Sequence, residues 1–164
     1  MDDTAKSIIK HHQIAELVAI AFGNDLKLSN RAIWVLQHCS DLENDTIKPY
    51  LNELILKLST IPLSDMFKRC VLKICLNNDI PEKHQIAVLE ICYLILNNPH
   101  EAIAIRSLCM PIIYNISKPY PELLKELTLV LKNILLEETT PALLAKARIV
   151  LKKIEKTTTK TVLF

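Results

Sequence analysis

Glycine is nearly absent from this chain of 164 residues, which contains one Gly beside eight Pro. Gly-rich phosphate loops and dinucleotide-binding fingerprints need several glycines, so the sequence argues against both. Tight hairpin turns also favour Gly, and its scarcity argues against an all-β fold. Aromatic residues make up only 5% of the chain, with a single Trp. We therefore expect neither a bound cofactor of the nucleotide type nor any other cofactor.

An excess of charge of one sign is lacking as well. Lys and Arg number 20 and Asp and Glu 18, which gives a formal net charge of +2. A dedicated nucleic-acid-binding protein is usually far more basic, and a disordered tail more strongly charged. Apolar residues make up 50% of the chain and suffice for one sizeable core. We expect a single domain over residues 1–156 and a C-terminal tail without helical character over 157–164.

Signals for export and membrane insertion are not found in the sequence. The first residues are polar and acidic, unlike the basic start and apolar run of a secretory signal. The most apolar stretch, residues 86–96, contains Glu90 and is shorter than the ~18 residues of a membrane span. These features predict a cytoplasmic protein that makes no membrane contact.

Cysteine pairs of the C-x-x-C type are missing, and the cysteines are odd in number. Each one lies within an apolar helical pattern, which is typical of reduced thiols in a core. A metal site or a cysteine nucleophile is the less common alternative, because zinc ligands cluster at short spacing. His11 and His12 are adjacent and would point about 100° apart on a helix. We expect no metal. The five cysteines are Cys39, Cys70, Cys75, Cys92 and Cys109.

Apolar residues recur with helical spacing along almost the whole chain, as in Leu51, Leu54, Ile55 and Leu58. The breaks between such segments carry Asn, Asp, Ser, Thr or Pro, which are typical of helix starts. Each break therefore separates two helices. The predicted helices span 4–22, 29–40, 46–59, 64–77, 82–97, 100–117, 121–137 and 141–156.

The helices also repeat in pairs. A cation followed by a small residue recurs at intervals of about 40 residues, within the range of helical repeats. A small side chain lets the second helix of a pair approach its neighbour closely. The predicted repeats cover 4–41, 45–77, 82–117 and 121–156. The recurring pairs are Arg31-Ala32, Arg69-Cys70, Arg106-Ser107 and Lys146-Ala147.

This pattern resembles the HEAT-repeat family. Asn24-Asp25 ahead of the run Arg31-Ala32-Ile33-Trp34-Val35-Leu36 is most similar to a family unit. The stretch 30–154 also resembles a group of small bacterial HEAT-like proteins. The further segments that carry this similarity are Lys48-Pro49-Tyr50-Leu51, Lys68-Arg69, Asp79-Ile80-Pro81-Glu82, Ala104-Ile105-Arg106 and Tyr120-Pro121-Glu122-Leu123.

The resemblance implies an all-α fold, a right-handed α–α superhelix of about four helix pairs. It further implies a non-catalytic module that binds a protein or peptide on its concave face. The net charge of +4 over residues 61–164 favours an acidic partner. The alternative is a nucleic-acid-binding protein similar to the HEAT-like DNA glycosylases, whose basic groove cradles a duplex.

The candidate binding residues lie on the second helix of each predicted pair. Trp34 stands near Arg31 and His38 on one face of 29–40, and these side chains are suited to a contact patch. The alternative for Trp34, and the more common role of a Trp, is packing against a neighbouring helix. For the cations the alternative is a solvated helix face. The full set is Arg31, Trp34, His38, Arg69, Lys73 and Arg106.

No catalytic constellation is recognisable. Ser and His are scattered without a nucleophile elbow, and acidic pairs such as Glu137-Glu138 fall at predicted helix ends, where capping explains them. We therefore predict that the chain is not an enzyme. The segment 140–164 carries six Lys or Arg and one Glu, which fits a polar terminal cap helix.

Overall fold

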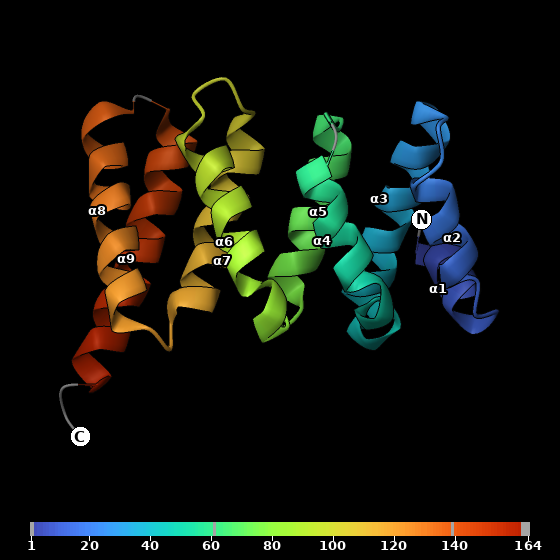
Figure 1. The fold of residues 1–164 in the computed structure, drawn as a ribbon, viewed down its shortest axis with the longest axis horizontal. Helices are drawn as coiled ribbons and strands as arrows, with labels where there is room; N and C mark the ends of the chain where they lie inside the picture. The colour runs from blue at the N-terminus through green and yellow to red at the C-terminus, as the bar shows by residue number, and fades with distance from the viewer. Residues whose placement is uncertain (1, 61, 139, 162–164) are drawn as a thin grey trace. The chain divides into compact units, whose positions relative to one another are not determined.

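The computed structural model describes residues 2–60, 62–138 and 140–161, and the regular elements among them are all helices (Figure 1). The prediction of an all-α fold is confirmed for this part of the chain. The α-helices are α1 (Asp2–Lys10), α2 (Ile14–Ala21), α3 (Leu26–Leu42), α4 (Leu51–Thr60), α5 (Asp65–Asn77), α6 (Glu82–Asn97), α7 (Ile103–Ser117), α8 (Pro121–Glu137) and α9 (Pro141–Thr161).

The helices form two compact units, residues 1–84 and 85–164, and the division falls within the first turn of α6. In the first unit, α3 packs on α1, α2 and α5, and α4 packs on α5. In the second unit, α7, α8 and α9 pack on one another. About four helix pairs are therefore present, as predicted. The right-handed superhelix and a single domain over 1–156 stay predictions.

The expected first helix over 4–22 is in fact two helices, α1 and α2. His12 between them has a φ of 54°, in the left-handed region. Its N–H donates to the Ile9 carbonyl at 3.1 Å, and the Gln13 N–H donates to the Ile8 carbonyl at 3.0 Å. This pair of bonds is the Schellman motif, which ends a helix and usually has Gly at the left-handed position. The prediction failed because His carries no such signal.

Three other expected helix starts are wrong as well, and the helix expected to begin at 100 begins only at Ile103. Helix α3 begins at Leu26 rather than 29, because the Asp25 carboxylate accepts from the N–H groups of Lys27 at 2.9 Å and Leu28 at 3.0 Å. The segment expected to begin a helix at 46 forms two short 3₁₀ turns, Asn44–Thr46 and Lys48–Tyr50. Pro49 has no N–H to donate, and the α-helix starts only at Leu51.

The expected non-helical tail over 157–164 is corrected in its first part, because α9 continues to Thr161. Side-chain hydroxyls bond back to carbonyls one turn earlier, as Thr158 does to Ile154 at 3.1 Å and Thr159 to Glu155 at 2.8 Å. Such bonds satisfy the hydroxyls within the helix. Residues 162–164 of that tail lie outside the described residues.

Each unit has its own apolar core. In the first unit, Ile33 and Leu36 of α3 are fully buried together with Leu54 of α4 and Ile74 of α5. The core of the second unit is drawn from every one of its helices. Its fully buried members include Leu96, Ile105, Ile113, Leu127, Leu131 and Leu143. These cores fix the orientation of α3, α5, α7 and α9, the second helices of the predicted pairs. Positions on these helices that lie off the core face are available to solvent.

The small residues of the repeat pattern are buried in three repeats, with Ala32 3% exposed and Cys70 and Ala147 0% exposed. Ser107, in the third repeat, is only half-buried.

We expect Ala32→Leu to lower the free energy of unfolding by about 1 to 3 kcal/mol, because a larger side chain must displace packed neighbours. Urea unfolding followed by circular dichroism measures the change. The matched control is Ala19→Leu at an exposed position of α2. An equal midpoint for Ala32→Leu and the wild type would show that position 32 is not close-packed.

Candidate functional site

Trp34 lies on the exposed side of α3, with 36% of its surface accessible to solvent. His38 follows one turn later and meets the indole edge-on, with ring centroids 5.4 Å apart and an interplanar angle of 67°. Arg31 is exposed one turn before Trp34. The three candidate residues of α3 therefore form one accessible stripe, as the spacing predicts. Trp34 is therefore not fully buried, although the larger part of its surface is covered by the protein.

Helices α3 and α5 run parallel and touch along their length. Near their N-terminal ends the Ser64 hydroxyl donates to the Asn30 side-chain oxygen. Towards their C-terminal ends the Asn77 amide donates to the Asp41 carboxylate at 2.8 Å. Between these pairs the Cys70 thiol points to the Gln37 side-chain oxygen at 3.9 Å. The two helices are thus held in a fixed register.

The exposed residues of α5 lie on the same side as those of α3. Opposite the exposed stripe, the Ser29 hydroxyl of α3 donates to the Ala21 carbonyl of α2. The exposed Arg69 and Lys73 lie next to Cys70, which faces α3. Because the helices are parallel, these positions share a face with the stripe of α3. We call this face the α3–α5 surface, defined by Arg31, Trp34, His38, Arg69 and Lys73.

The α3–α5 surface is positively charged. Among the described residues, no carboxylate lies within ion-pair distance of its two arginines or its lysine. Arg69 contacts the Met66 sulfur at 3.4 Å, a residue that the sequence analysis did not single out although it lies three positions away on the same helix. The nearby Asp41 carboxylate is occupied by the Gln37 and Asn77 amides. Three cations without a carboxylate partner among the described residues therefore lie on the same face as one accessible indole.

Arg106, the remaining candidate, is not on an accessible surface. It is 5% exposed. Its Nε donates to the Leu96 carbonyl in the last turn of α6 at 3.0 Å, and its Nη2 forms an ion pair with Glu138 Oε1 at 2.7 Å. A helix C-terminus and a carboxylate both attract a cation, which explains the inward position. The expectation of Arg106 as a surface anchor is therefore corrected.

The cysteines are free and buried, as the apolar patterns around them predict. Burial raises the pKa of Cys39 to about 11. Burial also raises the pKa of Cys70 to about 11, although Arg69 and Lys73 partly oppose the shift. In the part of the chain that the structure describes, no group of His, Cys, Asp and Glu is placed to hold a metal ion.

We expect all five thiols to react slowly in the folded protein. Burial shields all five from a reagent in solution. In addition, Cys39 and Cys70, with a pKa of about 11, are about one part in a thousand thiolate at pH 8, and the thiolate is the reactive form. Timed labelling with a thiol reagent, counted by mass spectrometry, tests this with the urea-unfolded chain as control. Modification of most thiols within seconds under native conditions contradicts the expected protection.

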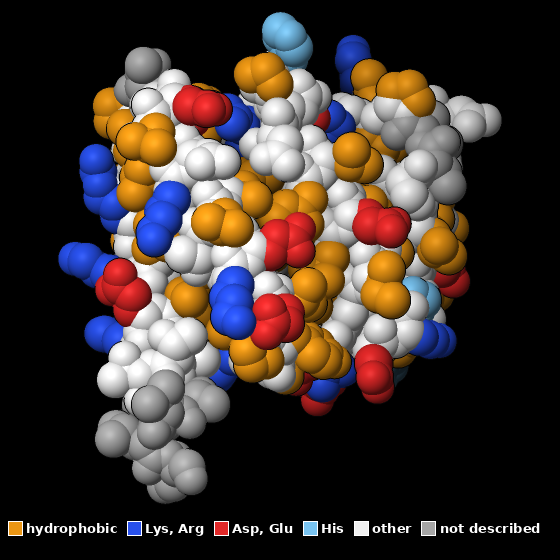
Figure 2. All heavy atoms as spheres, turned by 60° about the vertical axis from the view of Figure 1, so that its left-hand side comes forward, with side chains coloured by type: hydrophobic (Ala, Val, Ile, Leu, Met, Phe, Trp, Pro, Cys, Tyr) orange, Lys and Arg blue, Asp and Glu red, His pale blue; other side chains and the backbone are white. Residues whose placement is uncertain are grey.

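Basic residues also gather on α9, where the exposed cations are Arg148, Lys152, Lys153 and Lys156. Figure 2 views the side on which α8 and α9 lie and shows Lys and Arg side chains along one edge. Apolar side chains are spread between the charged ones on the rest of this face (Figure 2). Among the described residues, no helix has the length and apolar character needed to cross a bilayer.

Comparison with known proteins gives a family match. The family model of the HEAT repeat domain matches residues 2–154, which is nearly the whole chain. No curated protein and no solved structure matches.

Proposed function

Because the chain belongs to the HEAT repeat family, we propose that it is a non-catalytic scaffold that binds a protein partner on its α3–α5 surface. The observation that carries this proposal is the accessible Trp34 of α3. It shares a face with Arg31 of the same helix and with Arg69 and Lys73 of α5. Trp and Arg contribute more than other residues to interface energies. Helical repeats also offer extended surfaces rather than enclosed pockets.

The charge of the surface favours an acidic partner. Three cations without ion-pair partners raise the local concentration of an acidic segment, and a carboxylate that meets them replaces water rather than an existing salt bridge. Binding is then expected to weaken as salt rises. All five cysteines are free and buried, and thiols stay reduced in the cytosol, so they support a cytoplasmic location for this interaction.

A triple variant, Arg31→Ala/Trp34→Ala/Arg69→Ala, tests the proposal. The wild type and the variant are used to capture partners from native cell extract, and the recovered proteins are quantified. We expect recovery of the specific partner to fall about tenfold or more, because several interface anchors are lost together. Circular dichroism and an unfolding curve confirm that the variant is folded.

The matched control removes one large apolar side chain and two cations elsewhere on the first unit. It is Lys10→Ala/Leu56→Ala/Lys83→Ala, and all three positions are exposed. Equal recovery from both variants contradicts the proposal.

Nucleic-acid binding, the alternative function, is tested by gel shift at two salt concentrations. A steep loss of nucleic-acid binding with salt that depends on the α3–α5 residues would favour that alternative.

A further inference from the structure

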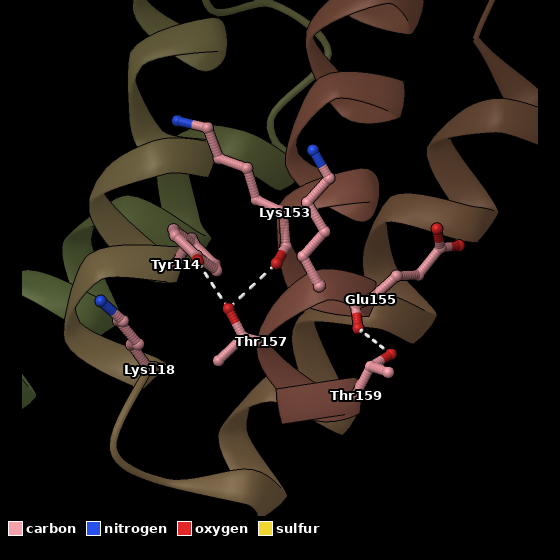
Figure 3. Close-up of a pocket in the computed structure, with 7 residues that line it drawn as sticks. Tyr114, Lys118, Lys153, Glu155, Thr157 and Thr159 are labelled. Carbon is pink, nitrogen blue, oxygen red and sulfur yellow. Dashed lines mark hydrogen bonds between the residues drawn. The ribbon is translucent and has the colours of Figure 1, made fainter. Parts of the chain in front are cut away.

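A surface hollow of about 720 Å³ lies between the C-terminal end of α7 and the last turns of α9. Tyr114 and Lys118 line it from α7 and the residue that follows it, and Lys153, Lys156 and Thr157 line it from α9, with Glu155 and Thr159 beside them (Figure 3). The hollow belongs to the second unit and is separate from the α3–α5 surface. Its volume is in the range of small binding sites.

The hydroxyl groups in the hollow have a defined direction. The Thr157 hydroxyl donates its proton to the Lys153 carbonyl at 3.0 Å. The Tyr114 hydroxyl lies 2.8 Å from the same Thr157 oxygen, so the Tyr114 hydroxyl is the donor in that pair. Both protons are therefore used within the protein. The Tyr114 oxygen keeps lone pairs that accept a hydrogen bond from a ligand.

The charge of the hollow is positive. Lys118, Lys153 and Lys156 are exposed, and no described carboxylate is within ion-pair distance of them. Among the described residues that line the hollow, the acidic one is Glu155, and it points its carboxylate away from Tyr114 in Figure 3. Its backbone carbonyl accepts from the Thr159 hydroxyl at 2.8 Å. An anionic ligand thus meets three ammonium groups without displacing an internal partner.

We propose that this hollow binds an extended acidic peptide segment. Its carboxylates meet the three lysines, an apolar side chain covers the Tyr114 ring, and a backbone N–H donates to the Tyr114 oxygen. A phosphate group fits less well, because it offers no N–H and would bring acceptor oxygens to an oxygen that has already donated its proton. The peptide supplies both the negative charge and the missing donor.

The experiment uses the full chain and a fluorescein-labelled peptide of about eight residues in which Asp and Leu alternate, about 26 Å long when extended. Fluorescence anisotropy measures its dissociation constant up to about 1 mM protein. We expect Lys118→Gln/Lys153→Gln/Lys156→Gln to weaken binding about tenfold or more. Tyr114→Phe removes the acceptor oxygen together with its hydrogen bond to Thr157, and it is expected to weaken binding about fivefold.

The matched control, Lys132→Gln/Lys146→Gln/Arg148→Gln, removes the same charge from other positions of the second unit. Equal weakening by both triple variants would show general charge attraction and overturn the proposal. No binding of the acidic peptide, or tighter binding of an oligothymidylate of equal length that is likewise lost in the hollow variant, also overturns it. Because the hollow and the α3–α5 surface share no residue, the Arg31/Trp34/Arg69 variant reports separately on the proposed function.

Discussion

Replacing Arg106 with Ala is expected to lower the free energy of unfolding by about 3 to 5 kcal/mol. The change removes a guanidinium that is 6% exposed and leaves two unsatisfied groups, the Leu96 carbonyl and the Glu138 carboxylate, the latter only 20% exposed. A buried group that loses its partner pays its full desolvation cost. Urea unfolding followed by circular dichroism measures the loss.

Two further variants test whether the loss arises from the unpaired Glu138 carboxylate. Arg148→Ala removes an exposed arginine from α9 and is expected to change the stability by no more than about 0.5 kcal/mol. The double variant Arg106→Met/Glu138→Leu removes both charges together and is expected to recover part of the loss, since no unpaired carboxylate remains. A double variant less stable than Arg106→Ala would show that the charge pair itself is not the source of the effect.

Replacing Leu36 with Ala is expected to destabilise the protein by about 2 to 5 kcal/mol. Leu36 is 0% exposed in the core of the first unit, and its truncation leaves a cavity that neighbouring side chains fill only in part. Leu28→Ala is the matched control, because Leu28 is on the same helix with 53% of its surface exposed. It is expected to cost at most about 0.5 kcal/mol.

This pair of variants also tests which face of α3 is buried in the core and which is exposed. If Leu36→Ala and Leu28→Ala shift the urea midpoint equally, the assigned core face of α3 is wrong, and the exposed stripe with Trp34 would be wrong with it. The result is therefore a check on the α3–α5 surface that does not require a known partner.

Local patterns in the sequence suffice for the helices whose ends carry strong signals. Ser64 caps α5 by accepting from the Phe67 N–H at 3.2 Å, and Pro121 begins α8, both as predicted. The start of α3 was missed because Ser29 looks like a cap although its hydroxyl bonds to α2, while Asp25 is the real cap. The break at His12 was missed because a left-handed His has no distinctive sequence context.

Local sequence patterns also do not determine which candidate site residues are exposed. Arg69 and Arg106 occupy equivalent places in the repeat, yet Arg69 is exposed and Arg106 is buried. The difference arises from Leu96 and Glu138, which are distant in sequence and come close to Arg106 only in the folded unit. Tyr114 and Thr157 are likewise brought together by packing of α7 on α9, and no spacing in the sequence predicts that they are in contact.

The polar pairs between α3 and α5 bear on how the chain tolerates changes of length. Side chains at both ends of the two helices fix their register, through Ser64 with Asn30 and through Asn77 with Asp41. The Asn78 amide adds a buried bond to the Ser40 hydroxyl at 3.1 Å. Register therefore does not depend on the number of residues in the connection before α5. A one-residue insertion after Leu63 is expected to be accommodated there, whereas the same insertion inside α5 would break the pairs that follow it.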